Sequence, residues 1–237
     1  MNGPNNSIGY CDFTANPVSG KCLHNCPDCY AERIRVRYAK PAEIKYHPDW
    51  LNAGQIRTFI KKNNRPPKIF LGSMHDLFGD WIDNGAIQDT IDRCKDHPEV
   101  IFQFLTQNPK RYQEFTWPDN CWIGTTCRTH AEAEDRIPLL IQAKAKIRFV
   151  SFEPLLENVK PIYTLSYFMP DLIHWCIVGC KTPYHKGFLA QWAKDIIEQC
   201  RIAKVPVWVK QLPNADGKAI KDMNEFPIWA RRREFPK

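Results

Sequence analysis

The chain has 237 residues, of which 43% are hydrophobic, so it is long enough to bury a sizeable core. Its formal net charge of +7 favours a polyanionic partner, although dispersed, solvated basic faces explain the same excess. No apolar run reaches the roughly 20 residues of a membrane span. Residues 1–5 have neither the basic start nor the apolar core of a signal peptide. We therefore expect a cytoplasmic protein with no membrane partner.

The apolar pattern predicts strands and helices that alternate along the chain. The expected strands are 8–14, 68–71, 100–105, 121–126, 147–152, 175–178 and 205–210. The expected helices are 31–38, 53–62, 81–94, a short one from 110, 130–143 and 189–203. This order predicts an α/β fold with a parallel sheet, and six or seven units suit a partial (β/α)6-7 barrel.

A flavodoxin-like open sheet is the alternative architecture. Its first strand is normally followed by a glycine-rich phosphate loop, and this chain has a cysteine loop there instead. We expect a single domain over residues 1–237, with a core at about 8–212 and a basic C-terminal tail at 213–237.

Three of the ten cysteines lie close together, with the spacing C-x3-C-x2-C: Cys22, Cys26 and Cys29. The other seven are scattered singly, which is unlike the disulfide frameworks of short secreted chains. Thiolates grouped in this way suit an iron–sulfur cluster or zinc. A structural zinc site needs a fourth ligand, and His24 is the nearest candidate, although the chain has little slack there. Surplus thiols or a disulfide are the third alternative.

Polar or small residues stand at or just after the end of almost every expected strand. They are Ser73, His75 and Asp76; Thr106; Thr125 and Thr126; Ser151 and Glu153; Gly179; and Lys210 with Gln211. The carboxyl ends of the strands carry the chemistry in barrels of this type. We therefore expect the functional residues at these positions.

The spacing of the three cysteines resembles that of the radical S-adenosylmethionine (SAM) superfamily. The resemblance implies that Cys22, Cys26 and Cys29 bind a [4Fe–4S] cluster whose open iron binds SAM. It also implies that one electron from an external reductant splits SAM into methionine and a 5′-deoxyadenosyl radical. Many members have an aromatic residue just before the last cysteine, where this chain has Asp28. Tyr30 is then the candidate for the adenine contact.

Further motifs resemble a phage-associated, radical-SAM-like family of unknown function, over about residues 8–212. They are Asn16 to Gly20, Cys29 to Arg33, Gly72 to Phe78, Phe104 to Thr106 with Pro109 and Arg111, Asp135 to Leu140, Arg148 to Leu156, and Lys210 with Gln211. Two departures stand out. The family often has Gly-Gly-Glu at Gly179-Cys180-Lys181, and in this chain Lys21 separates the first cysteine from the preceding glycine.

The resemblance also implies SAM contacts at the strand ends. Ser73 and Asp76 follow the strand that usually binds the amino group of SAM, and an ordinary turn with a helix cap is the alternative. Ser151 and Glu153 follow a later strand; for Glu153, contact with a ribose hydroxyl or a substrate amine competes with an ion pair to Arg148 or Lys210. Lys210 itself is a candidate for the SAM carboxylate or a substrate phosphate.

Several other residues have two interpretations. His75 is either an acid or base near neutral pH or a structural histidine. Cys127, Cys176 and Cys180 are either buried thiols or part of a second cluster, and Cys127 or Cys180 is a candidate hydrogen donor. Four tryptophans suit either base stacking or the core: Trp117, Trp122, Trp175 and Trp208.

Three classes of function follow. The favoured one is a radical SAM enzyme that abstracts hydrogen from a nucleotide or a nucleic-acid base, in modification or repair. The second is the same chemistry on a peptide or small metabolite, and the third is a non-catalytic metal-cluster module that binds nucleic acid. If nucleic acid is the partner, we expect phosphate contacts from the basic helix 31–38 and from Arg231, Arg232 and Arg233.

Overall fold

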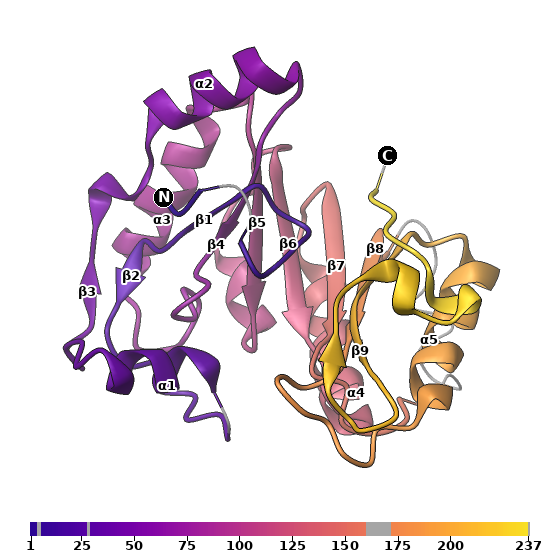
Figure 1. The fold of residues 1–237 in the computed structure, drawn as a ribbon. Helices are drawn as coiled ribbons and strands as arrows, with labels where there is room; N and C mark the ends of the chain where they lie inside the picture. Colours follow the sequence, from indigo (N-terminus) through magenta and orange to yellow (C-terminus); the bar gives the residue numbers. More distant parts are fainter. Residues whose placement is uncertain (4–5, 28, 160–171, 237) are drawn as a thin grey trace. The chain divides into compact units, whose positions relative to one another are not determined.

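A computed structural model describes residues 1–3, 6–27, 29–159 and 172–236 (Figure 1). Asp28, at the position before the last clustered cysteine, lies outside the described residues. The chain divides into two compact units, Met1–Ile123 and Gly124–Lys237, which we describe separately. The single domain expected over 1–237 stays a prediction.

Unit 1 begins with three short strands and an exposed helix, followed by alternating helices and strands. Its elements are β1 (Phe13–Ala15), β2 (Val18–Ser19), α1 (Tyr30–Arg37), β3 (Lys45–Tyr46), the 3-10 turn η1 (Pro48–Trp50), α2 (Ala53–Asn63), β4 (Lys68–Leu71), α3 (Asn84–Lys95), β5 (Ile101–Thr106) and η2 (Pro109–Glu114). Strand β6 (Cys121–Thr126) contains the boundary between the units. β1 pairs with β4 and β4 with β5, both in parallel, and β2 pairs with β3 antiparallel.

The core of unit 1 lies between its strands and the apolar face of α3. Ile69 and Phe102 are fully buried on neighbouring strands, and Ile87 and Ile91 are buried one helical turn apart on α3. This spacing of four residues is what the sequence pattern predicts for a helix that covers a sheet. At about 25 cal/mol per Å² of buried apolar surface, such side chains contribute most of the stability of the unit.

Helix α3 begins at Asn84, three residues later than the predicted start at Trp81. The carboxylate of Asp83 caps the helix by accepting hydrogen bonds from the backbone N–H groups of Gly85 (2.8 Å) and Ala86 (3.3 Å). The cap satisfies donors that the first helical turn leaves without partners. Trp81 and Ile82 are apolar, so the helical sequence pattern starts earlier in the chain than the helix itself.

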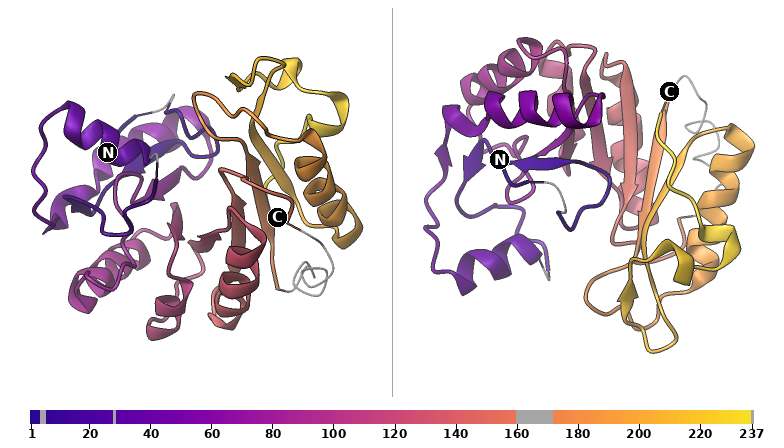
Figure 2. Two further views of the ribbon diagram at one scale, coloured as in Figure 1. Left: turned by 90° about the horizontal axis from the view of Figure 1, so that it is seen from below. Right: turned by 45° about the horizontal axis from the view of Figure 1, so that its top comes forward.

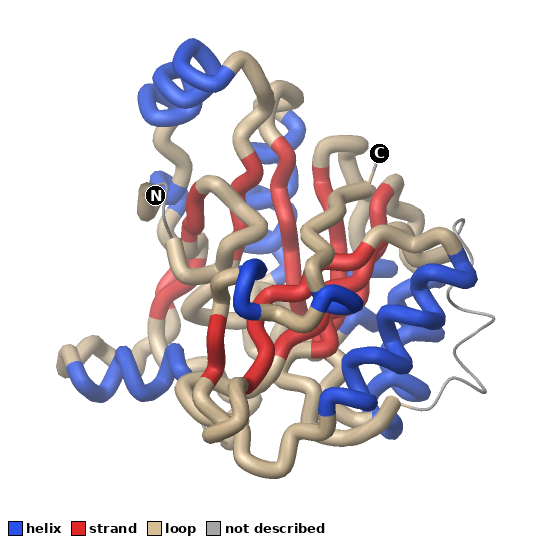
Figure 3. The backbone as a smooth tube through the Cα atoms, turned by 45° about the vertical axis from the view of Figure 1, so that its right-hand side comes forward, coloured by secondary structure: helices blue, strands red, loops and turns tan. Residues whose placement is uncertain are grey.

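Unit 2 continues the alternation of strands and helices. Its elements are α4 (His130–Gln142), β7 (Ile147–Phe152), β8 (Trp175–Gly179), α5 (Ala190–Ala203), β9 (Val207–Pro213), β10 (Ala219–Ile220), η4 (Met223–Glu225) and η5 (Ile228–Ala230). β7 pairs with β8 and β8 with β9 in parallel, whereas β10 pairs with β9 antiparallel. Figure 3 shows α5 beside the strands of this unit, where it packs on β8.

The basic C-terminal tail is folded onto β9 (Figure 2). The backbone N–H of Val209 donates to Arg232 (2.9 Å), and the N–H of Glu234 donates to Val207 (3.0 Å). All three tail arginines contact their own unit: Arg231 donates to the carbonyls of Phe226 and Asn224, Arg233 donates to that of Lys221, and Arg232 pairs with Glu234. The sequence did not predict this role, because a basic segment without an apolar period indicates no strand.

Among the described residues, the main sheet has eight strands in the order β1-β4-β5-β6-β7-β8-β9-β10. The α/β class is therefore confirmed, with a mostly parallel sheet that is not closed into a barrel. The partial (β/α)6-7 barrel stays a prediction. No helix in the described ranges is long and apolar enough to cross a membrane.

The four tryptophans considered for base stacking are all buried. Trp175 is 0% exposed, and Trp117, Trp122 and Trp208 are 7% exposed. The rings of Trp117, Trp175 and Trp208 pack on other aromatic side chains, such as Trp117 on Phe104 at 5.3 Å between ring centroids. They belong to the core, and the stacking interpretation is wrong for these residues.

Candidate functional site

The three clustered cysteines line one cavity in unit 1. Cys22 and Cys26 lie in the loop that follows β2, and Cys29 is the residue before α1. All three are half-buried free thiols, and the cavity has a volume of about 400 Å³. Burial raises the pKa of the Cys22 thiol, against the opposing effect of backbone N–H groups of Asp76 and His24.

The cavity fits a [4Fe–4S] cluster by its donor set. Within the described ranges, no three His, Cys, Asp or Glu side chains converge closely enough to hold a single metal ion. A cluster is wider than an ion, so its thiolate ligands do not converge on one point, and three cysteines that line one cavity are a donor set of this kind. Binding would require the thiols to lose their protons, since the thiolate is the ligand.

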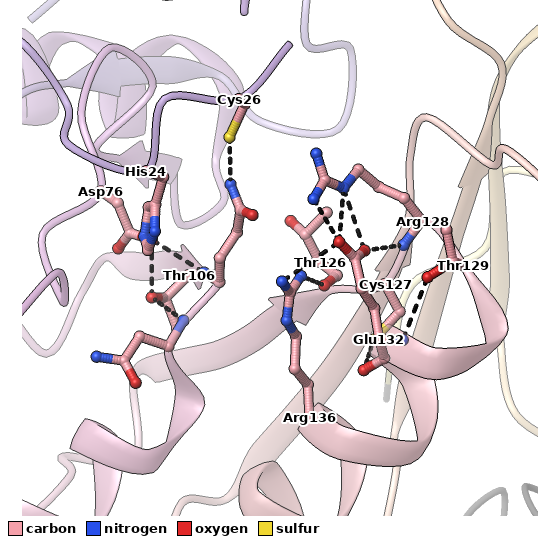
Figure 4. A network of polar contacts seen from close by, with 12 residues as sticks. His24, Cys26, Asp76, Thr106, Thr126, Cys127, Arg128, Thr129, Glu132 and Arg136 are labelled. Atoms are coloured by element: carbon pink, nitrogen blue, oxygen red, sulfur yellow. Dashed lines mark hydrogen bonds and ion pairs between the residues drawn. The ribbon is translucent and has the colours of Figure 1, made fainter.

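Asp76 joins the cysteine loop to the carboxyl ends of β4 and β5. Its carboxylate lies 2.7 Å from Nε2 of His24, which stands between Cys22 and Cys26 (Figure 4). It also accepts hydrogen bonds from the Thr106 hydroxyl and from the backbone N–H groups of Gln107 and Phe78, each at 2.9 Å. Burial alone would raise the pKa of Asp76, but these donors hold it below its ordinary value.

A second contact reaches the cysteine loop from the end of β5. The side-chain amide of Gln107 donates from Nε2 to Sγ of Cys26 at 2.8 Å, which is the contact drawn at the sulfur in Figure 4. The same residue is fixed through its backbone by Asp76. One carboxylate therefore positions both the histidine of the loop and the amide that touches its sulfur.

Asn16, at the end of β1, organises the turn after β4. Its Oδ1 accepts hydrogen bonds from the Ser73 hydroxyl (3.2 Å) and from the backbone N–H of Met74 (2.8 Å). The Tyr30 hydroxyl donates to the Ser73 carbonyl. Asn16 and Met74 line the cavity with the three cysteines, so this turn forms part of its wall.

His75 is buried next to this turn, with 4% of its surface exposed. Its Nδ1 lies 3.0 Å from the Asp76 carbonyl, and its ring meets that of Trp81 edge-on at 6.1 Å. Burial lowers the pKa of His75, so its imidazole is neutral at pH 7. The Nδ1 contact favours the structural interpretation of this histidine, whereas Nε2 is buried without a hydrogen-bond partner among the described residues, so the role of His75 stays a prediction.

A separate polar cluster lies in unit 2, where β7 ends. Oε1 of Glu153 accepts from Nζ of Lys210 at 2.6 Å and from Nε2 of Gln211 at 2.7 Å. The ion pair considered for Glu153 is thus formed with Lys210. Arg148 instead donates to the carbonyls of Leu172, Ala143 and Ala145.

Ser151 and the remaining unit 2 thiols are deeply buried. Ser151 is 1% exposed, and its hydroxyl has no hydrogen-bond partner in the part of the chain that the structure describes. Cys127, Cys176 and Cys180 are all 0% exposed. Burial, with the nearby Glu153, raises the pKa of Cys180 to about 12. At neutral pH this thiol therefore stays protonated, and Cys180 packs as an uncharged, buried side chain.

Sequence reasoning missed Asn16 and Gln107 as site residues. Gln107 directly follows Thr106, which was expected at a strand end. The position of Gln107 just after this strand could therefore have indicated a site residue. Asn16 belongs to a quoted motif, but the short β1 hid that it lies beside the end of β4. Of the predicted residues, unit 1 holds the three cysteines with Tyr30, Ser73 and Asp76, and unit 2 holds Ser151, Glu153 and Lys210.

Comparison with known proteins shows a family match over residues 5–225, to "Protein of unknown function (DUF5131)". The chain belongs to this family, whose description names neither an activity nor a phage. No curated protein matches the chain. A solved structure of spore photoproduct lyase complexed with dinucleoside spore photoproduct is similar to it, with 11% identity and a TM-score of 0.47. The similarity covers 88% of this chain and 68% of that one.

Proposed function

We propose that this chain is a radical SAM enzyme in which Cys22, Cys26 and Cys29 hold a [4Fe–4S] cluster. The observation that carries the proposal is that these three thiols, spaced C-x3-C-x2-C, line one cavity of about 400 Å³. When bound, such a cluster supplies an open iron for SAM and one electron for its cleavage. The chain's own residues hold the loop, form the cavity wall and position the substrate.

The wall next to the cysteines supplies the proposed SAM contacts in unit 1. Ser73 and Met74 lie in a turn held by Asn16, and Tyr30 is 48% exposed, with its hydroxyl on the Ser73 carbonyl. The Ser73 carbonyl, which has a second lone pair, is proposed to accept from the amino group of SAM, and the Tyr30 ring is proposed to contact adenine. Direct contact between Asp76 and SAM is part of the proposal, although this carboxylate already accepts four contacts within the chain.

In unit 2, the polar cluster of Ser151, Glu153 and Lys210 is proposed to bind cofactor or substrate, from the chemistry of its own side chains. Lys210 and Glu153 form a close ion pair whose side chains are each 16% exposed, so both remain accessible to a ligand. The unpartnered, buried hydroxyl of Ser151 belongs to the same strand end in the described part of the chain. A ribose hydroxyl suits Glu153, and a carboxylate or phosphate suits Lys210.

For the substrate we propose a nucleotide or nucleic-acid base. Helix α1, directly after the cysteine loop, buries only Ala31, and Arg33 and Arg37 are exposed on it. Exposed tyrosines flank these arginines: Tyr30 at its start and Tyr38, 63% exposed, just after its end. Basic and aromatic side chains together are typical of surfaces that bind single strands. A peptide or small metabolite, and a non-catalytic nucleic-acid module, are the outcomes that would replace this proposal.

The metal content tests the proposal first. Anaerobically reconstituted protein should be brown and hold about four irons and four sulfides per chain. Cys26→Ala should lose the cluster, because two thiolates do not retain it. Cys11→Ala is the matched control, since Cys11 is also a half-buried cysteine but lies outside the loop. Colourless protein with one zinc per chain would contradict the proposal.

A further inference from the structure

We propose that Gln107 sets the reduction potential of the cluster by donating a hydrogen bond to the Cys26 sulfur. This inference rests on the proposed function. It assigns a role to a residue that contacts a cysteine ligand of the cluster, Cys26, and not the substrate. Gln107 lies 81 residues from Cys26 in the chain, yet its Nε2 is 2.8 Å from Sγ. A thiolate accepts hydrogen bonds and donates none, so the amide must present its N–H2 group to it.

The backbone of Gln107 and the cysteine loop are both anchored to Asp76. The backbone N–H of Gln107 donates to Oδ2 of Asp76 at 2.9 Å, and the preceding Thr106 donates to the same oxygen at 2.9 Å. On the other side, His24 ties the cysteine loop to that carboxylate at 2.7 Å. Donor and acceptor are thus anchored to one buried group, so the hydrogen bond needs little further ordering when the site is loaded.

The direction of the effect follows from charge. Reduction adds one electron to a cluster held by thiolates, so negative charge on the sulfurs increases. A fixed N–H donor stabilises that added charge and favours the reduced state, since hydrogen bonds to the sulfurs help to set the potential. With Gln107 in place, the cluster is therefore easier to reduce than it would be without this donor.

Redox titration of the loaded full-length protein, followed by electron paramagnetic resonance, tests the inference. Gln107→Leu keeps much of the side-chain volume and removes the donor. It should load iron and sulfide as the unmodified chain does, but have a more negative midpoint potential. At the midpoint of the unmodified protein, the ratio of reduced to oxidised cluster should fall about tenfold, equivalent to about 59 mV for one electron.

Two further variants separate an effect on the reduction potential from an effect on the fold or on cluster uptake. Gln113→Leu makes the same chemical change at an exposed position in η2, and its potential should not move. Gln107→Asn keeps an amide but withdraws it by one methylene, so its potential should also become more negative. It serves as the second variant if Gln107→Leu takes up no iron.

Each outcome supports or overturns the inference. Equal potentials in the unmodified protein and a loaded Gln107 variant would overturn it while leaving the proposed function intact. If neither Gln107 variant takes up iron but Gln113→Leu does, the residue has a structural role and the inference is wrong. If the unmodified chain itself takes up no cluster, the proposed function fails and this inference fails with it.

Discussion

Asp76 has more polar contacts than any other carboxylate around the cysteine cavity among the described residues. It accepts from a ring nitrogen, a hydroxyl and two backbone N–H groups, with its side chain 9% exposed. Leaving a buried donor without its partner costs about 1–3 kcal/mol. The carboxylate thereby connects the histidine of the loop to the ends of two strands, and its removal should loosen the proposed cluster site.

We expect Asp76→Asn to lower the free energy of unfolding by about 2–4 kcal/mol at pH 7, because the new amide turns N–H groups toward existing donors. The pKa of Asp76 is lowered in the folded chain, so its contribution is present above the unfolded value near 3.9 and is lost as the pH falls below it. The difference between the two proteins in urea unfolding should therefore shrink below about pH 4.

Asp92→Asn is the control for this substitution. Asp92 is exposed on α3 and accepts one hydrogen bond from Gln88, so its replacement should change stability by less than about 0.5 kcal/mol. An Asp76→Asn protein as stable as this control at pH 7 would show that the carboxylate does not hold the loop.

At the residue scale, the sequence predicted the positions of polar residues relative to the strands better than it predicted which residues they contact. Ser73, Asp76 and Glu153 follow strand ends, as predicted, whereas Lys210 lies within β9, and the roles of all four stay predictions. The pairing of Glu153 with Lys210 was one of the predicted alternatives. The contact of His24 with Asp76 depends on a long-range pairing of strands and loops that a local pattern does not encode. The Gln107 contact to a sulfur 81 residues away was missed for that reason.

At the scale of elements, regular apolar runs were the reliable signal. β4, β6 and β7 have the predicted bounds, because each is a short apolar run between turn residues. The pairing of β2 with β3 was missed, since these strands have only two residues each and the cysteine loop and α1 lie between them. β9 extends three residues beyond the prediction because β10 pairs with its end at Leu212 and Pro213.

Helix α1 is the element that tests the proposed substrate class. If it binds single-stranded nucleic acid, Arg33→Glu with Arg37→Glu should weaken binding to a labelled oligonucleotide. The slope of log affinity against log salt should flatten by about 0.7 for each phosphate that the variant no longer neutralises. A base inside a duplex is out of reach of a buried cavity, so we also expect single strands to bind better than duplexes.

Lys61→Glu with Lys62→Glu is the matched control, because it reverses the same charge at the end of another exposed helix, α2. It should leave the salt slope unchanged. Tail arginines should matter less than those of α1, since they already contact their own unit. An unmodified chain that binds no oligonucleotide at low salt would favour the peptide or small-metabolite alternative.

At the scale of the whole molecule, composition and order predicted the class but not the division of the chain. The alternating pattern indicated an α/β protein with a mostly parallel sheet, as observed. The boundary between the two compact units falls inside β6, after Ile123. Proline or glycine clusters mark linkers between elements, so a boundary within an apolar strand carries no such signal and could not be predicted.

The proposed function requires that this chain cleaves SAM, and the release of 5′-deoxyadenosine measures that cleavage directly. Anaerobically loaded, chemically reduced protein is incubated with SAM, and the products are quantified by mass spectrometry, with Cys26→Ala as the control. We predict slow formation of 5′-deoxyadenosine and methionine even without substrate, and none from the variant. Protein that holds about four irons, is fully reduced and leaves SAM intact would contradict it.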